Sequence, residues 1–552
     1  MGVTRAATLH RVSRFPLDDR SALNAGQRLD HLGKMTSSHL DLVVVGGGVT
    51  GCGIALDAAS RGLAVGLLEQ RDYGSGTSSR SSKLFHGGLR YLQTLQFGLV
   101  REALAERNLM LETIAPHLVE PASFVYPLRH RVWERAYVGA GVLFYDILAA
   151  LSRSPLPRHR HLTRKGVLGV APGLSPSAMV GGIRYWDAVV DDARHTVTLA
   201  RTAANHGALL ASSVRVVGLL REGDRVSGAR ALDLETGYEF DISARSVVSA
   251  AGVWTDDLQA LAGEPRRDVI ASKGIHLVVP RETITSSSGI ILRTATSVLF
   301  VIPWGDHWII GTTDTPWALH RAHPAASASD IRYLLEEVNR VLCRSLTHDD
   351  IVGVYAGLRP LLAGETDSTS RLSREHAVMT SGSGLVAVAG GKLTTYRIMA
   401  RDAVDAALPS IGREVPGSRT HEITLVGADR PDQIDRLSKE RLDLGSQLGE
   451  SRFRHADVVY GVTHEGALHL DDVLTRRTRI SIETQARGTD VAPEVAELMG
   501  DLLGWDAATR DREVGHYRAR VAAERDSQTR PDDQTADAAR MGAPDVRTGP
   551  SD

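Results

Sequence analysis

The residues with the clearest chemical meaning are the glycines of segment 46–51, which reads Gly-Gly-Gly-Val-Thr-Gly. Their spacing fits G-x-G-x-x-G, in which Gly46 allows a tight turn, Gly48 lets backbone approach a pyrophosphate, and Gly51 lets helix and strand pack closely. The helix that follows points its first N–H groups at the anion. Glu69 ends the next expected strand, where a carboxylate can accept hydrogen bonds from a ribose diol. The spacing therefore predicts a dinucleotide site.

Short polar and glycine-rich segments further along could complete this site. Residues 77–83 are rich in hydroxyl groups, which could line a bound diphosphate, although a surface loop is the alternative. Ala250-Ala251-Gly252 and Gly390-Gly391 each follow an expected strand, so their backbone can come close to a cofactor. The second group would bring the Thr394 hydroxyl near the reactive end of that cofactor. The glycine unit alone does not separate NAD from FAD.

Histidines and arginines supply candidates for proton transfer and anion binding. His86 precedes a glycine pair, and imidazole titrates in the range that a general base needs near neutral pH. His276 alternates with apolar neighbours, which also fits a histidine that is satisfied within a sheet. Arg90 and Arg359 stand between glycine or proline and apolar residues, where a solvated surface arginine has no evident reason to be.

Several other polar or aromatic residues are interpreted as structural. Asp187, Asp191 and Arg194 could touch an active site, but capping and salt-bridge contacts near a helix start are the favoured interpretation. The same applies to aromatic and sulfur side chains that are expected to pack in the interior. These are Trp304, Trp308, Trp317 and Cys52.

The elements that must position these residues are α/β in pattern. Residues 42–45, 54–60 and 64–68 read as strand, helix and strand, which is a β-α-β unit. Helical spacing is also expected at 99–114, 132–151 and 191–206. Further strands are expected at 214–220, 229–234, 247–250, 275–279, 298–303, 308–311 and 385–389. The middle of the chain therefore predicts a substantial antiparallel sheet beside the parallel unit.

The pattern changes after about residue 410. Residues 432–523 are helical in spacing, charged and poor in strands, so a separate helical domain is expected there. Residues 526–552 have almost no large apolar side chains and are expected to be disordered. The predicted domains are an N-terminal extension (1–38, with a possible helix over 21–32), a composite of two interleaved domains (39–410), a C-terminal helical domain (411–525) and a tail (526–552).

Composition sets limits on the class of protein. The chain has 552 residues, 42% hydrophobic residues and a formal net charge of −2, so no global field favours nucleic acid. Two cysteines form no disulfide framework, and no Cys/His cluster has zinc spacing, so no metal is expected. No run approaches the length of a membrane span, and no secretory signal is recognisable. Any membrane contact is therefore expected to be peripheral.

Five spaced motifs resemble those of the FAD-dependent glycerol-3-phosphate dehydrogenase family, in family order. They are Ser81–Leu92, Tyr185-Trp186-Asp187 with Asp191–Arg194, Gly311-Thr312-Thr313-Asp314, Gly357–Leu361, and Gly390–Arg397. The resemblance covers residues 40–400 and continues more weakly into the helical domain, at Val458–Glu465 and Asp472–Arg479.

The resemblance implies a fold and a cofactor. The fold would be a Rossmann-like FAD domain of the D-amino-acid-oxidase type, interleaved with a β-sheet substrate domain and followed by a C-terminal helical domain. FAD would contact residues spread along three parts of the chain. They are Gly46, Gly48, Gly51, Glu69, Thr77, Ser78, Ser82, Lys83, Val216, Ala250, Gly252, Gly391, Lys392, Leu393 and Thr394.

The resemblance also implies an activity, the oxidation of sn-glycerol 3-phosphate to dihydroxyacetone phosphate in glycerol catabolism, with hydride transfer to flavin N5. The substrate would be held by cations and one tyrosine, because guanidinium and ammonium groups match phosphate oxygens. These residues are Arg90, Tyr91, Arg359, Arg374 and Lys392. Arg371 is an alternative to Arg374. His86 is the first candidate for the base and His276 the second, while Arg359 could stabilise a developing alkoxide.

In this family electrons pass to membrane quinone, so the resemblance implies peripheral attachment to the inner face of the cell membrane, with a cytoplasmic location and a homodimer. An oxygen-using glycerophosphate oxidase is the first alternative, although no added insertion of that branch is recognisable. An amine or amino-acid oxidase of the same fold is the second, and it would not need this set of cations. A non-catalytic FAD-binding protein is the alternative outside enzymes, but such proteins usually lose the substrate cations.

Overall fold

The computed structural model describes residues 19–88, 96–152, 154–264, 269–294, 298–362, 376–543 and 546–547. Its first sheet is built on the predicted β-α-β unit, which is formed by β1 (Leu40–Val45), α3 (Val49–Ser60) and β2 (Val65–Leu68). β1 pairs in parallel with β2 on one side and with β10 (Glu239–Ser249) on the other. β18 (Val386–Gly390) pairs in parallel with β10, and β7 (Leu209–Ala211) with β2. The parallel core of this sheet therefore has its strand ends aligned at one edge.

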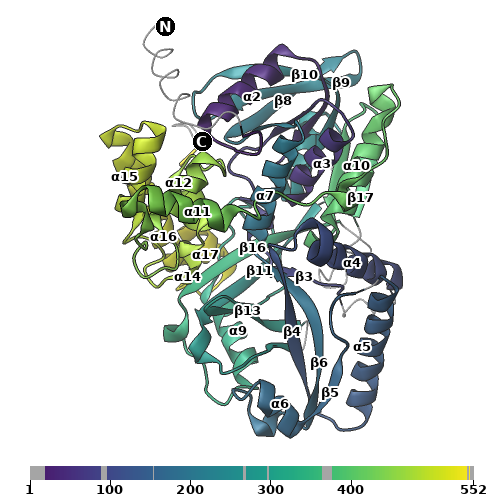
Figure 1. Ribbon diagram of the computed structural model, residues 1–552, viewed down its shortest axis with the longest axis vertical. Helices are drawn as coiled ribbons and strands as arrows, with labels where there is room; N and C mark the ends of the chain where they lie inside the picture. Colours follow the sequence, from purple (N-terminus) through teal and green to yellow (C-terminus); the bar gives the residue numbers. More distant parts are fainter. Residues whose placement is uncertain are drawn as a thin grey trace.

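Helices cover this sheet because their small side chains allow close packing. α3 packs against α7 (Asp192–Asn205) and α10 (Tyr396–Ile411). The contact surfaces are rich in alanine, including Ala58, Ala203 and Ala403, all of them fully buried. Three antiparallel strands, β8 (Val214–Glu222), β9 (Arg225–Asp233) and β17 (His376–Thr380), extend the sheet. Figure 1 shows this layer at the top of the molecule.

The second sheet lies in the lower half of Figure 1 and is mostly antiparallel. Its strands follow the order β15-β11-β14-β13-β12-β4-β6-β3, while β16 pairs with β11 and β5 with β6. Their bounds are β3 (Leu84–Phe85), β4 (Val119–Leu128), β5 (Arg160–Thr163), β6 (Gly181–Val190), β11 (Val269–Pro280), β12 (Gly289–Arg293), β13 (Val298–Trp304), β14 (His307–Gly311), β15 (Thr315–Trp317) and β16 (Gly353–Leu362). The antiparallel sheet expected in the middle of the chain is confirmed.

The two sheets are interleaved along the sequence. The chain forms β1 and β2 in the first sheet, β3 to β6 in the second, β7 to β10 in the first, β11 to β16 in the second, and returns with β17 and β18. Helices α4 (Phe97–Leu109, continued by η3, Met110–Ile114), α5 (Trp133–Leu151), α6 (Arg164–Val170) and α9 (Ala328–Asn339) surround the second sheet. Loops that cross between the sheets therefore meet where the first sheet's strands end.

A helical domain follows the two sheets, as expected. Its helices are α11 (Arg430–Glu440), α12 (His455–Thr463), α13 (Leu470–Asp472), α14 (Ile480–Glu483), α15 (Ala492–Leu503) and α16 (Ala507–Ser527). A core of its own forms around Val458, Leu474, Val495 and Met499. Buried ion pairs fasten it to the first sheet, because Asp72 binds Arg477 at 2.7 Å and Arg194 binds Glu465.

Both ends of the described chain are more ordered than their composition indicated. The predicted helix near the N-terminus is α2 (Ala25–Ser37), which begins after the cap residue Asn24. The prediction of a disordered tail is wrong at α17 (Asp533–Arg540), which is capped by Asp532. This helix docks through polar contacts, since Asp533 pairs with the buried Lys273 and the Ala328 amide donates to the Arg530 carbonyl at 2.8 Å. A composition rule that counts apolar side chains misses such contacts.

Candidate cofactor and active site

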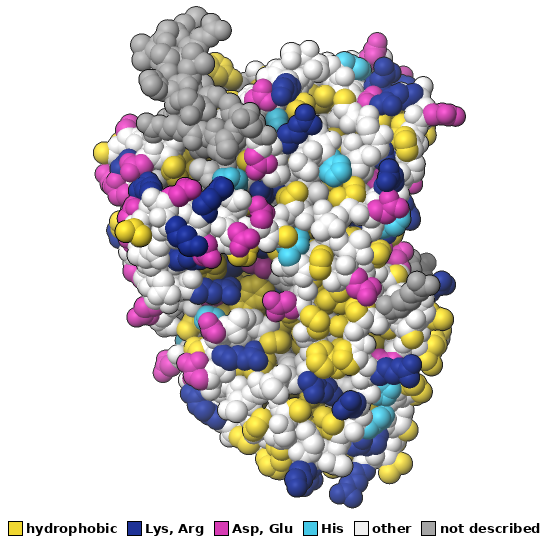
Figure 2. All heavy atoms as spheres, in the orientation of Figure 1, with side chains coloured by type: hydrophobic (Ala, Val, Ile, Leu, Met, Phe, Trp, Pro, Cys, Tyr) yellow, Lys and Arg dark blue, Asp and Glu magenta, His cyan; other side chains and the backbone are white. Residues whose placement is uncertain are grey.

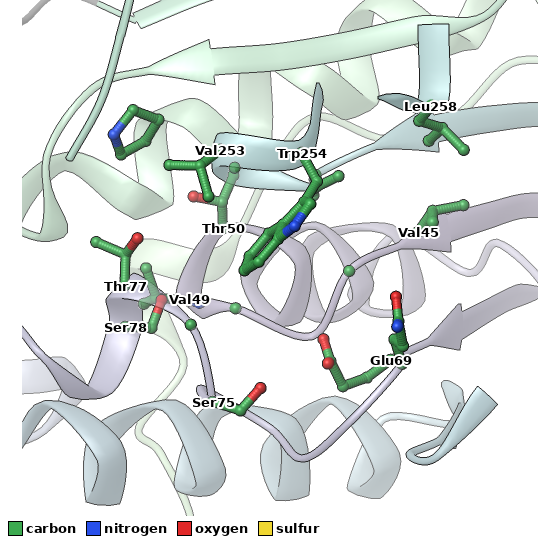
Figure 3. A pocket seen from close by; sticks show the side chains of 18 of the residues that line it. Val45, Val49, Thr50, Glu69, Ser75, Thr77, Ser78, Val253, Trp254 and Leu258 are labelled. Carbon is green, nitrogen blue, oxygen red and sulfur yellow. Dashed lines mark hydrogen bonds between the residues drawn. The ribbon is translucent and has the colours of Figure 1, made fainter. Parts of the chain in front are cut away.

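A cavity of about 310 Å³ lies where β1, β2, β10 and β18 end. This is the edge at which open parallel sheets bind ligands, because crossing loops diverge there. Glu69 lies toward one end of the cavity and Thr77 and Ser78 toward the other, with the Trp254 ring across it (Figure 3). Many of the residues predicted for FAD line it. These are Gly46, Gly48, Glu69, Thr77, Ser78, Val216, Ala250, Gly252, Gly391, Lys392 and Leu393.

The glycines do what their spacing predicted. Gly46 has φ +111°, and a Cβ there would stand 2.6 Å from the Ala250 carbonyl oxygen. A Cβ at Gly51 would meet the Gly46 carbonyl oxygen at 1.8 Å, so only glycine permits this contact between helix and turn. Gly48 is the cap residue of α3, and it lines the cavity. The N-terminus of α3 therefore faces the cavity, where the Val49 amide donates to the Ser78 hydroxyl at 2.9 Å.

Glu69 is held in place at the rim. One carboxylate oxygen accepts a hydrogen bond from the Gly47 amide at 2.6 Å, and the other accepts one from the Arg71 amide at 2.7 Å. Burial raises the pKa of this carboxyl, although both hydrogen bonds oppose the shift. A fixed carboxylate at the end of β2 suits a ribose diol. Contact with a cofactor by each of these residues stays a prediction.

Three predicted cofactor residues contact other protein groups instead of lining the cavity. Ser82 bonds through its Oγ to His276 Nε2 at 2.9 Å. The Lys83 ammonium is fully buried and forms an ion pair with Asp192 at 2.6 Å. The Thr394 hydroxyl bonds to the backbone of His86. Lys83 thus holds α7 against the loop of residues 77–83, and its ammonium group is engaged there.

His86 lies close to the end of the cavity that carries Lys392 and Leu393. The Thr394 hydroxyl accepts from the His86 amide and donates to the His86 carbonyl, both at 3.3 Å. The next residue is fixed as well, because the Gly87 amide donates to the Tyr145 hydroxyl at 2.9 Å. That hydroxyl in turn donates to Asp187 at 2.6 Å. The backbone beneath His86 is therefore anchored on both sides.

His276 is buried within the second sheet. Its ring stacks on Tyr355 with centroids 4.7 Å apart, and its Nε2 bonds to Ser82. Burial, followed by the nearby charges of Arg359 and Lys83, holds the pKa of His276 well below its ordinary value of 6.5. Ser82 satisfies Nε2, whereas the buried Nδ1 has no hydrogen-bond partner among the described residues, so the alternative of a histidine satisfied in a sheet holds for one ring nitrogen only.

Arg359 projects from β16 into a set of oxygen acceptors. Its Nη2 donates to Thr312 Oγ1 at 3.0 Å and to the Thr313 carbonyl at 3.2 Å, while Nη1 lies 3.6 Å from Asp314. Gly274, on the neighbouring strand, leaves room for the guanidinium, because a Cβ there would stand 2.4 Å from Nη2. Pro360 lines the cavity directly beside Arg359. The segment Gly311–Asp314 is thus the positioning frame of this arginine.

Four of the predicted substrate residues lie outside the described residues. They are Arg90, Tyr91, Arg371 and Arg374. Arg359 and Lys392 are therefore the predicted cations whose places are known: Lys392 lines the cavity, and Arg359 precedes the lining residue Pro360 in β16. The sequence did not single out Trp254, Tyr145 or Ser272, whose hydroxyl donates to Asp314. Their proximity to known motifs was the only available signal.

The residues interpreted as structural have structural contacts. Asp191 caps α7 by accepting from the Arg194 amide at 3.1 Å, and Asp187 accepts from Arg107 at 2.7 Å. Trp304, Trp308 and Trp317 are buried. Cys52 is buried as well, and its thiol bonds to the Gly47 carbonyl.

Known proteins resemble the chain over nearly its whole length. Residues 41–397 match the family model of FAD-dependent oxidoreductases, and residues 433–510 match that of the C-terminal domain of α-glycerophosphate oxidase. The glycerol-3-phosphate dehydrogenase of Mycobacterium leprae is 53% identical, covering 96% of each chain. The human mitochondrial glycerol-3-phosphate dehydrogenase is 36% identical over 85% of this chain and 71% of its own length.

A solved structure agrees with the sequence relatives. The glycerol-3-phosphate dehydrogenase of Bacillus halodurans, complexed with FAD, superposes with a TM-score of 0.72 at 28% identity, covering 90% of this chain and 97% of its own. The L-α-glycerophosphate oxidase of Mycoplasma pneumoniae shares the fold, with a TM-score of 0.54 at 17% identity, covering 71% of this chain. The chain therefore belongs to the FAD-dependent oxidoreductases, within the glycerol-3-phosphate dehydrogenase family.

Proposed function

We propose that the protein oxidises sn-glycerol 3-phosphate to dihydroxyacetone phosphate with bound FAD and passes the electrons to membrane quinone. The observation that carries the substrate assignment is Lys392 in the lining of the dinucleotide cavity, with the oriented guanidinium of Arg359 on the residue before the lining residue Pro360. A substrate with a phosphate dianion needs such charges, and relatives named for this substrate match both domains. An amino acid would not need both cations.

The residues of the cavity fit FAD. Close backbone at Gly46 and Gly48 suits a pyrophosphate, and the Glu69 carboxylate suits a ribose. A second approach of backbone at Ala250 and Gly252 faces the same space. When bound, FAD supplies the oxidation by accepting two electrons from the substrate, while the protein supplies orientation and charge.

Cationic side chains would bind the substrate through its phosphate group, and a base would remove the proton of its C2 hydroxyl group. Arg359 presents a planar fork whose position is fixed by Thr312 and Asp314, and Lys392 adds a second positive charge. Because His86 stands on backbone that the Thr394 hydroxyl anchors, it is the first candidate to take the C2 hydroxyl proton. His276 stays neutral and buried, so its role would be to hold Ser82 and the loop before β3.

Membrane attachment is supported by one face of α5. Apolar side chains recur along this helix at helical spacing and are exposed to solvent, among them Trp133 (58% exposed), Ile147 (49%) and Leu151 (69%). Exposed basic residues lie nearby in the chain. They are Arg129, Arg131, Arg158, Arg160, Arg164 and Lys165. Hydrophobic side chains among Lys and Arg are visible at the lower right of Figure 2, where Figure 1 places α5.

This combination is typical of a helix that lies in the headgroup region with its apolar face toward the acyl chains. None of the helices in the described ranges is long and apolar enough to cross a bilayer. Peripheral attachment at the inner face of the cell membrane would bring the enzyme close to quinone. The homodimer stays a prediction.

Steady-state turnover tests the proposal. The FAD-loaded full chain is assayed with a soluble quinone, using glycerol 3-phosphate, glycerol and glycine as substrates in parallel. Of the three substrates, only glycerol 3-phosphate is expected to be turned over, because only its phosphate group can bind both Arg359 and Lys392. Turnover with glycine alone would overturn the assignment in favour of an amino-acid oxidase, and faster turnover with oxygen than with quinone would favour the oxidase alternative.

A further inference from the structure

A second cavity lies on the far side of the loop that carries Thr77 and Ser78. Ser79 and Arg80 continue this loop but line the second cavity, so the loop is a wall shared with the cofactor cavity. The remaining walls come from β16, from residues 479–482, and from helices α16 and α17 of the C-terminal part. Its volume of about 60 Å³ is enough for a few water molecules or one small ion.

The lining of this cavity carries an excess of positive charge. It contains four arginines and one carboxylate, namely Arg80, Arg479, Arg520, Arg540 and Glu524. Glu524 is shared, because it lies 2.6 Å from Arg520 and 3.4 Å from Arg540. Arg479 is neutralised elsewhere by Asp191 and Asp192. Arg520 has a further partner in Asp471 at 2.8 Å.

Arg80 is the arginine of this cavity whose positive charge is least neutralised by nearby carboxylates. Its Nη1 donates to the Ala322 carbonyl at 3.3 Å, and no carboxylate among the described residues lies within ion-pair distance. Burial, followed by repulsion from Arg540 and Arg71, lowers the pKa of Arg80 from 12.5 to about 9. Glu524 opposes this shift only in part. Arg80 is half-buried, and because charges taken out of water are normally paired, its guanidinium can accept an anionic partner in the cavity.

A hydroxyl group without a partner lies in the same cavity. Ser481, at the start of α14, is 4% exposed, and its Oγ has no hydrogen-bond partner among the residues that the structure describes. A buried hydroxyl that makes no hydrogen bond costs about 1–3 kcal/mol. An anion in the cavity would accept a hydrogen bond from the Ser481 hydroxyl and would also balance the positive charge of Arg80.

We propose that this cavity binds a small tetrahedral oxyanion of the size of inorganic phosphate, with Arg80 and Arg540 as its charge partners and Ser481 as a hydrogen-bond donor. Guanidinium groups bind such oxygens in bidentate fashion, and a compact ion fits the volume. The bound anion joins the cofactor loop to α16 and α17, and so fastens the C-terminal helices to the body. The site is independent of the substrate proposed above.

Thermal unfolding of the FAD-loaded full chain tests this site. Inorganic phosphate is titrated against sodium chloride at constant ionic strength, and a saturable rise in Tm of about 2 °C is expected. Arg80→Gln should abolish most of the rise. Ser481→Ala, which removes the hydroxyl without adding side-chain atoms and leaves the cofactor loop intact, should raise the half-saturating phosphate concentration about tenfold. Arg230→Gln, which removes an exposed ion pair with Asp241, is the matched control and should keep the full rise.

Two further arms locate and identify the anion. Arg359→Gln should keep the phosphate effect, whereas loss in Arg359→Gln with retention in Arg80→Gln would place the anion in the active site and overturn the proposal. No saturable effect of phosphate beyond that of chloride would overturn it as well. Methyl phosphate distinguishes the source: an equal rise that needs Arg80 assigns the site to phosphoryl groups, and a rise with inorganic phosphate alone assigns it to the free ion.

Discussion

Arg359 illustrates how single residues of the site depend on their neighbours. Its guanidinium is oriented by the Thr312 hydroxyl, the Thr313 carbonyl and Asp314, and Asp314 is itself held by Ser272. Arg359→Lys preserves the charge but not the planar fork, so kcat/KM for glycerol 3-phosphate is expected to fall about 100-fold. Steady-state kinetics with soluble quinone measures the loss. Arg230→Lys, which alters an exposed pair with Asp241 away from the cavity, should change kcat/KM little, and equal activity of Arg359→Lys and wild type would contradict the assigned role.

The two histidines are separated by a pH profile. His86→Asn is expected to lower kcat about 10²- to 10⁴-fold and to remove the acid limb of the kcat/KM profile, because proton transfer by a positioned base contributes that much. His276→Gln keeps a hydrogen bond toward Ser82 and should cost far less. Since the pKa of His276 lies well below 6.5, its titration falls outside the range near neutrality. The reverse ranking of the two variants would assign the base to His276.

Elements were more predictable from the sequence than individual contacts. The β-α-β unit, α7 and part of each sheet could be predicted because hydrophobic periodicity and glycine spacing are local signals, whereas β4, β6 and β16 were not predicted. The role of Gly311–Asp314 in positioning Arg359 could not be predicted, because it depends on β14 and β16 both pairing with β11. Lys83 could be matched to a motif, but its burial against Asp192 is a long-range contact. Helix α17 was missed because it docks through ion pairs and the small side chain of Ala536, and neither raises the content of large apolar residues.

Helix α5 carries a prediction at the scale of elements. Ile147→Glu places a charge in the middle of the exposed apolar face, so binding to vesicles that contain anionic lipid should fall about tenfold or more. Co-sedimentation with such vesicles measures the fraction bound. Leu442→Glu changes a side chain that is 86% exposed in the helical domain and should bind as wild type does. Equal loss in both variants, or loss in neither, would refute attachment through α5.

At the scale of the whole molecule, buried charges hold the helical domain to the body. His469 bridges Glu235 beside the first sheet and Glu513 of α16, each at 2.9 Å. Burial and the charge of Arg547 act to lower the pKa of His469, but the carboxylates of Glu235 and Glu513 outweigh them and raise it to about 9. Asp472 is a further nearby charge, since it accepts a hydrogen bond from the His469 amide. The unfolded value is about 6.5. The stabilisation, about 2–3 kcal/mol, is therefore full below pH 6.5 and is lost as the pH rises toward 9.

A pH series of thermal unfolding checks this bridge. His469→Gln should unfold at a lower Tm than wild type at about pH 6, and the difference should narrow as the pH rises through about 9. The wild-type curve should fall over that interval while the variant's changes less. A Tm difference that stays constant from about pH 6 to 10 would show that the charge of His469 does not stabilise the domain contact.

The central claim is that this cavity holds FAD and that the protein oxidises glycerol 3-phosphate at the end of the cavity lined by Lys392. An anaerobic absorbance titration tests this claim most directly. The purified protein is mixed with increasing glycerol 3-phosphate while the flavin band is followed. Bleaching that is complete near equimolar substrate, followed by slow recovery in air and rapid recovery with quinone, is the predicted result. A flavin band that glycerol 3-phosphate leaves unchanged, while an amino acid bleaches it, would contradict the account.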